Sequence, residues 1–125
     1  MSKKVMVVDD DQEFLEELNE TLDLSGYAVV TVNNATKVAE EANREKPDVI
    51  LLDLKMPEKS GFQVADELKH ISELAHVPII VMTAFFKDDY LPLLSICGIH
   101  KCLKKPFNPL DVIAQIEEAI HKNDK

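Results

Sequence analysis

Five side chains that can do chemistry each follow a short apolar run: Asp9, Asp10, Asp53, Thr83 and Lys105. Grouped carboxylates repel one another, by about 4 kcal/mol for unit charges ~4 Å apart at an effective dielectric of ~20. A hard divalent cation removes that cost, and Mg²⁺ is often held by one or two carboxylates together with a phosphate. With Lys105 as a fixed positive charge and Thr83 as a hydroxyl donor, the set predicts a phosphoryl-transfer site. Asp53 is the candidate nucleophile, forming an aspartyl phosphate.

The apolar runs before these side chains are typical of strands buried on both faces of a parallel sheet. Strands are predicted over residues 4–8, 27–32, 49–53, 77–82 and 99–104, and the last is the least apolar and so a candidate edge strand. Helices are expected between them. The signals are three N-caps (Asp11, Asn34 and Asn108), the apolar stripes between the strands, and a proline in a short fourth helix beginning near Tyr90 or Leu91.

Two glycines have predicted roles beside these helices. Gly26 is expected to stop the first helix in the left-handed region. Gly61 is expected to end the loop that begins at Pro57, where glycine is able to adopt a positive φ.

Five strands alternating with five helices favour an α/β fold, a doubly wound (βα)5 three-layer sandwich. The carboxyl ends of parallel strands share one edge of the sheet, and ligands of such folds bind in the crevice beside that edge. The five side chains can therefore converge although they span most of the sequence.

Each of these residues alone has an ordinary structural interpretation. Asp53 could cap a helix, Thr83 could be a β-branched strand residue, Lys105 could be a solvated loop charge, and Asp9 and Asp10 could favour a helix N-terminus. Their common position at the predicted carboxyl edge favours a site instead. The sequence has neither a P-loop pattern nor GxGxxG, so it does not indicate a nucleotide pocket.

Composition limits the remaining classes of function. The 125 residues suit one domain, residues 1–125, and the formal net charge of −9 argues against a nucleic-acid-binding surface on this chain. No apolar run reaches the ~18 residues of a membrane span and no signal peptide is recognisable, so we expect a cytoplasmic protein without membrane contact. Cys97 and Cys102 lack metal-ligand spacing and are expected to be buried, reduced thiols.

Four segments in this order resemble the signature of response-regulator receiver domains, the CheY-like superfamily of two-component signalling. They are Val7-Val8-Asp9-Asp10, Leu51-Leu52-Asp53 with Met56-Pro57 and Gly61, Val81-Met82-Thr83-Ala84, and Lys105-Pro106-Phe107. The resemblance runs from Lys4 to about His121. It implies a flavodoxin/CheY-like sheet with strand order 2-1-3-4-5, in a domain that is not an enzyme beyond the phosphorylation and dephosphorylation of its own aspartate.

The resemblance also implies a role for each matching residue. Asp53 would accept a phosphoryl group from a histidine kinase or histidine phosphotransfer protein. Asp10 would bind Mg²⁺ (or Mn²⁺) directly, Asp9 mostly through water, and Lys55 through its backbone carbonyl, with Asp53 completing the metal site. Thr83 and Lys105 would bind the phosphoryl oxygens, and the domain would then switch conformation.

Several positions depart from the family pattern. Cys102 stands where an aromatic residue usually lies three positions before the conserved lysine, and Ser60 stands where aspartate commonly precedes the loop glycine. Lys55 and Phe85 hold the positions that tune the lifetime of the phosphoryl group, and their bulk predicts slow hydrolysis. Pro92 lies on the usual output face.

Alternative functions remain open at this point. The chain could be a stand-alone receiver or the receiver of a longer DNA-binding transcriptional regulator. It could instead be a Mg²⁺-dependent phosphohydrolase with an aspartate nucleophile, although Lys55 stands where such enzymes need a general acid, or a receiver fold used only for constitutive binding. Phe14 is either a core residue or a docking residue for the phosphodonor. The histidines (His70, His76, His100 and His121) are scattered and predict no phosphohistidine.

Overall fold

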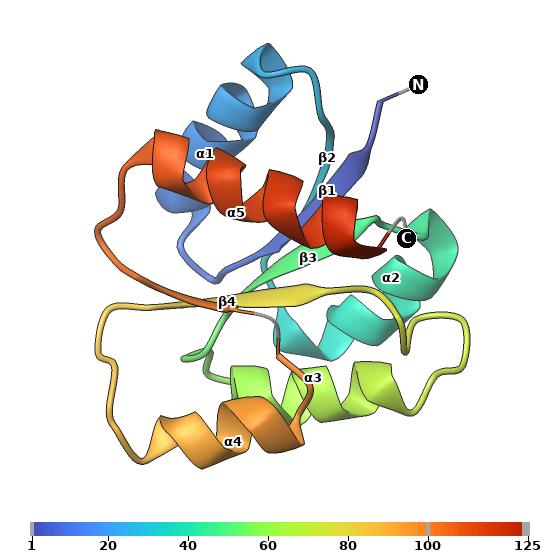
Figure 1. Ribbon diagram of the computed structural model, residues 1–125, viewed down its shortest axis with the longest axis vertical. Helices are drawn as coiled ribbons and strands as arrows, with labels where there is room; N and C mark the ends of the chain where they lie inside the picture. Colours follow the sequence, from blue (N-terminus) through green and yellow to red (C-terminus); the bar gives the residue numbers. More distant parts are fainter. Residues whose placement is uncertain (1, 100, 124–125) are drawn as a thin grey trace.

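The computed structural model describes residues 2–99 and 101–123 as five strands and five α-helices around one sheet (Figure 1). The elements alternate along the chain as predicted. In order they are β1 (Lys4–Val8), α1 (Gln12–Leu24), β2 (Ala28–Val32), a 3-10 turn η1 (Ala35–Lys37), α2 (Val38–Glu45), β3 (Val49–Asp53), α3 (Gly61–Lys69), β4 (Ile79–Thr83), α4 (Tyr90–Ile96), β5 (Lys101–Lys104) and α5 (Pro109–Asn123). None of the helices in the described residues is long and apolar enough to cross a bilayer.

All strand pairs in the sheet are parallel, and the strand order is β2-β1-β3-β4-β5. The predicted doubly wound sandwich is therefore confirmed, with β5 at an edge. Strands β2, β4 and β5 begin one or two residues later than their apolar patterns suggest. His100, inside the predicted fifth strand, lies outside the described residues.

Helices cover both faces of the sheet, which explains why the central strands β3 and β4 are apolar up to their last residue. Figure 1 shows α1 and α5 on one face and α2, α3 and α4 on the other. Alternate residues of one strand enter different cores: Met6 and Val8 pack with the α2–α3 side, whereas Val5 and Val7 pack with the α1–α5 side. In β3 and β4 the polar side chains, Asp53 and Thr83, stand at the carboxyl ends.

The predicted caps begin their helices as expected. Asp11 accepts a hydrogen bond from Phe14 N at the start of α1, and Asn108 accepts one from Leu110 N at the start of α5. Asn34 caps the η1 turn, which leads into α2. Pro92 lies in the first turn of α4, where proline is tolerated.

Gly61 does not use the positive φ that glycine allows, and it belongs to α3 rather than to the loop. Within the described residues the glycines with positive φ are Gly26, as expected, and Gly98. Gly61 is instead the first residue of α3, after a capping box formed by Ser60 and Gln63. A Cβ atom at Gly61 would lie 2.6 Å from the backbone oxygen of Asp53, so glycine lets α3 start against the end of β3.

We expect Gly61→Ala to lower the free energy of unfolding by about 1–3 kcal/mol, because the methyl group must displace backbone atoms of β3. Urea denaturation would measure this. Asp66→Ala changes an exposed position on the same helix and should stay within about 0.5 kcal/mol of the parent. A Gly61→Ala protein as stable as that control would show that the close approach is not required.

Candidate functional site

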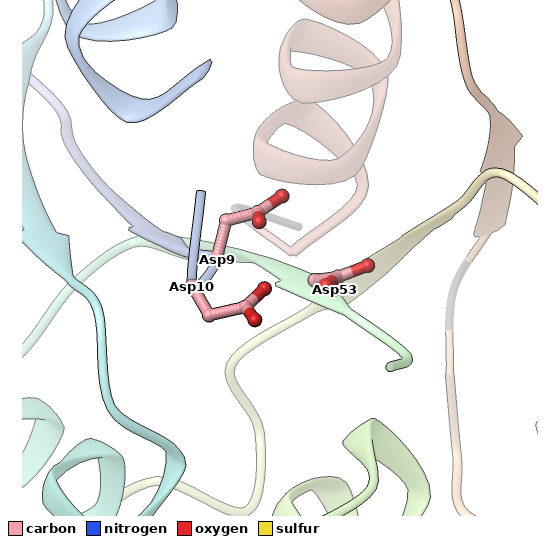
Figure 2. A group of neighbouring side chains, drawn as sticks. All are labelled: Asp9, Asp10 and Asp53. Carbon is pink, nitrogen blue, oxygen red and sulfur yellow. The ribbon is translucent and has the colours of Figure 1, made fainter. Parts of the chain in front are cut away.

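Three carboxylates meet at the carboxyl edge of the sheet. Asp9 and Asp10 follow β1, and Asp53 ends the neighbouring strand β3; Figure 2 shows the three side chains close together. One oxygen of each lies within 4.8 Å of the others. Asp9 and Asp53 are buried, whereas Asp10 is exposed. The convergence expected from parallel topology is therefore present for these residues.

Lys105 brings the compensating charge from the far end of the sequence. Its backbone N–H donates to the Thr83 carbonyl at 2.7 Å, which fixes the residue beyond the β4–β5 pair. Its Nζ forms an ion pair with Asp9 Oδ2 and lies 3.8 Å from Asp53 Oδ1. The same Nζ lies 4.2 Å from the centroid of the Phe14 ring, a cation–π contact that restrains the side chain over the pocket.

Asp53 is the carboxylate most altered by its surroundings. Burial and the nearby Asp9 charge raise the pKa of Asp53 to about 6, partly opposed by Lys105 and by the backbone N–H of Lys55. The positive charge and hydrogen-bond donors of the protein alone therefore do not fully compensate the negative charge of ionised Asp53. A cation bound beside it would favour the ionised, nucleophilic form.

Thr83 ends β4 one residue beyond Met82, which is the register partner of Asp53. The threonine is buried, and its Oγ1 accepts a hydrogen bond from Phe85 N at 3.1 Å. Over the same edge, Lys55 Nζ lies 5.2 Å from the centroid of the exposed Phe85 ring. The two residues expected to shield the site are thus in contact with each other.

The donor set fits a hard cation. The three clustered ligands all offer oxygen, and oxygen ligands are what Mg²⁺ and Mn²⁺ prefer. Both oxygens of Asp9 already have partners, because Oδ1 accepts from Asp11 N at 3.0 Å and Oδ2 pairs with Lys105. The solvent-facing Asp10 is better placed to bind an ion directly.

Sequence reasoning did not predict the contacts among the aromatic residues beside the site. Phe107 packs edge-on against Phe14 with ring centroids 5.9 Å apart, so Phe14 is a half-buried residue of the α1–α5 side. Phe86 and Tyr90, after Thr83, form a second aromatic pair. The Phe85-Phe86 doublet, one residue beyond the end of β4, was the available signal.

The cysteines partly match their prediction. Both are free thiols, but only Cys97 is buried, while Cys102 is half-buried. Burial raises the pKa of each thiol and so keeps it in the less reactive protonated form.

A family model described as the response regulator receiver domain matches residues 5–117. The chain belongs to this family. It is 31% identical to the alkaline phosphatase synthesis transcriptional regulatory protein PhoP of Bacillus subtilis, over 99% of this chain and 51% of that protein. It is 36% identical to the polar-differentiation response regulator DivK of Brucella anthropi, over 86% of this chain and 88% of that protein. The receiver chain thus spans about half of some relatives and most of others.

Solved receiver structures have the same architecture. The chemotaxis response regulator CheY4 of Vibrio cholerae superposes with a TM-score of 0.91 and 26% identity, over 95% of this chain and 99% of that chain. A CheY-like receiver domain protein from Methanospirillum hungatei gives a TM-score of 0.93 at 22% identity, over 99% of this chain and 98% of that one, a likeness of fold.

Removing the Asp53 charge should stabilise this receiver domain in a pH-dependent way. The pKa of Asp53 is higher in the folded protein, about 6, than its ordinary value of 3.8. The protonated form is therefore favoured on folding, and stability falls as the pH rises from about 3.8 to about 6. The pKa shift corresponds to a loss of folding stability of at most about 3 kcal/mol at neutral pH. Solvent screening reduces this loss to about 1–2 kcal/mol.

We therefore expect Asp53→Asn to raise the free energy of unfolding by about 1–2 kcal/mol at neutral pH without Mg²⁺, and the gain to vanish toward pH 4. Urea denaturation across this range would measure it. Added Mg²⁺ should narrow the difference by stabilising the parent. Asp66→Asn, the same change at an exposed position, should show no such pH-dependent gain. A constant difference at every pH would contradict the assignment.

Proposed function

We propose that Asp53 accepts a phosphoryl group from a phosphohistidine of a histidine kinase or histidine phosphotransfer protein. The observation that carries this proposal is the Asp9/Asp10/Asp53 cluster with Lys105 Nζ 3.8 Å from Asp53 Oδ1. The chain would then act as a two-component response regulator in the cytoplasm, controlling a partner or passing the phosphoryl group on.

The transfer exchanges one bond for another. A carboxylate oxygen of Asp53 attacks phosphorus, the P–O bond forms as the P–N bond to the donor imidazole breaks, and the released imidazole takes up a proton. Lys105 Nζ lies close enough to Asp53 to pair with a phosphoryl oxygen once the phosphoryl group is attached there. Thr83 offers a hydroxyl from the end of β4. These fixed groups stabilise charge that spreads over the phosphoryl oxygens.

Mg²⁺ or Mn²⁺ would be held by Asp10, Asp53 and the backbone carbonyl of Lys55, with Asp9 assisting, and would neutralise the carboxylate and phosphoryl charges. The pKa of Asp53, raised to about 6, supports a site completed by a cation. Metal binding favours deprotonated ligands, so the affinity should fall as the pH drops through that range.

The donor would approach over the aromatic side of the pocket. Phe14, Phe107 and Lys105 line a groove beside the acidic cluster, together with Glu17 and Ala84. Phe14 is half-buried, so its ring supports the pocket from within and also forms part of the surface that the donor would meet.

Hydrolysis of an external phosphoester is not favoured as the function. Lys55 occupies the position where an aspartate-based phosphohydrolase needs a general acid.

Incubation with acetyl phosphate and Mg²⁺ should add one phosphoryl group, measured by intact-protein mass spectrometry. A chelator should prevent the gain, because the carboxylates then repel both each other and the donor. Asp53→Asn should also prevent it, whereas Asp66→Asn should be phosphorylated like the parent. A Mg²⁺-dependent gain that persists in Asp53→Asn would move the acceptor elsewhere and overturn the proposal.

Phosphoryl lifetime should depend on the Lys55–Phe85 contact. The long side chain over the ring shields the acyl phosphate from water, so Lys55→Asn and Phe85→Glu should each hydrolyse faster. Lowering the activation barrier by up to about 1.4 kcal/mol would raise the rate of hydrolysis by as much as about tenfold. The decay of the phosphorylated mass after donor removal measures this, with the exposed Lys87→Asn as control. An unchanged or longer half-life in both variants would refute the shielding role.

A further inference from the structure

Lys105 brings positive charge to the proposed transfer site, and its ammonium group has partners of two kinds. Its Nζ forms an ion pair with Asp9 and lies 3.8 Å from Asp53 Oδ1. The same Nζ lies 4.2 Å from the centroid of the Phe14 ring. The Lys105 side chain is 19% exposed, so most of it is withdrawn from water.

The Phe14 ring is held in place independently of Lys105. Phe14 lies in the first turn of α1, and its backbone N–H donates to the capping residue Asp11. Its ring packs edge-on against Phe107, with centroids 5.9 Å apart and an interplanar angle of 77°, and both rings pack against the α1–α5 core. Figure 1 shows α1 and α5 on this same face of the sheet. The ring is therefore a fixed surface against which a flexible side chain can be positioned.

A lysine needs such a surface if its charge is to stay in one place. Its ammonium group is a compact, strongly hydrated charge on a flexible four-carbon stem. An aromatic face attracts a cation through the ring quadrupole, and the attraction is stronger when the pair is desolvated. The ring also occupies space around Nζ that water would otherwise fill, and charges interact more strongly where the local dielectric is lower.

We propose that Phe14 is a positioning residue for phosphoryl transfer that acts through Lys105. This inference rests on the proposed function and adds a residue to it. An ion pair with Asp9 alone would leave the ammonium group free to pivot about that carboxylate into water. The ring favours the position within reach of Asp53, where the charge can stabilise the phosphoryl oxygens.

A purely structural role for Phe14 makes a different prediction. The ring also fills space beside Phe107, and this packing depends on its shape. The attraction for Lys105 depends instead on the electron density of the ring face. Fluorine atoms on the ring withdraw that density and nearly conserve the shape, so the two roles can be separated at this single position.

The test replaces Phe14 with phenylalanine that carries one, two or three ring fluorines. The rate of phosphorylation by acetyl phosphate with Mg²⁺ is then measured by intact-protein mass spectrometry. We expect the rate to fall with each added fluorine, by about threefold to tenfold in total, as the usual strength of a cation–π contact implies. Phe14→Leu, which keeps an apolar side chain without a ring, should fall at least as far. Melting temperatures close to that of the parent would show that the fold is retained.

Two controls connect the effect to Lys105. The same fluorinated residues at Phe62, which packs against Tyr90 on the opposite face of the sheet, should leave the rate unchanged. In a Lys105→Gln protein, which should react more slowly than the parent, fluorination of Phe14 should make no further difference. The neutral amide is not attracted to the ring as a cation is, so the two changes should not be additive.

The outcomes distinguish this inference from the function on which it rests. If acetyl phosphate adds no phosphoryl group to the parent, or if the gain persists in Asp53→Asn, the proposed function fails and the role of Phe14 with it. If the parent is phosphorylated on Asp53 but the proteins fluorinated at Phe14 react at the parental rate or faster, the role of Phe14 alone is overturned. The same conclusion follows if fluorination slows the Lys105→Gln protein as much as it slows the parent.

Discussion

Repulsion among carboxylates at the sheet edge is the constraint on which this structure depends. A parallel sheet brings the ends of β1 and β3 together, and both end in acid, so Asp9 and Asp53 are buried beside each other. Lys105 balances part of that charge, but burial and the nearby Asp9 charge still raise the pKa of Asp53. The site is therefore stable enough to fold and still short of positive charge, which suits a pocket that takes up a cation and then a phosphoryl group.

The two faces of the sheet divide rigidity and movement between them. Helices α1 and α5 bury several side chains against one face, where Phe14 packs against Phe107 and contacts Lys105. On the other face α4 buries none, although α2 and α3 beside it do. A reaction that changes the charge at the carboxyl edge of the sheet would thus lie between a well-packed face and a loosely packed one. A change in conformation costs least on the loosely packed face, where α4 lies.

Sequence reasoning predicted the sheet, its parallel topology and the convergence of the acids, because buried strands and their polar ends leave strong one-dimensional signals. Helix caps such as Asp11 and Asn108 could also be predicted from the sequence, since a cap depends on a few adjacent residues. Gly61 was placed in the loop and not in α3, because the reason for its glycine is a close approach to the backbone of Asp53, which no pattern of adjacent residues reveals. The pairing of Phe86 with Tyr90 and of Phe14 with Phe107 depended on the same kind of tertiary contact.

The short strand β5 has a consequence for how this protein coexists with its own copies. An open sheet edge presents unpaired backbone groups to which a strand of another chain can add. Here the edge strand is four residues long and carries exposed lysines at both ends, Lys101 and Lys104. Two copies that approached edge to edge would set these charges against each other, so the strand is protected against the growth of intermolecular sheets.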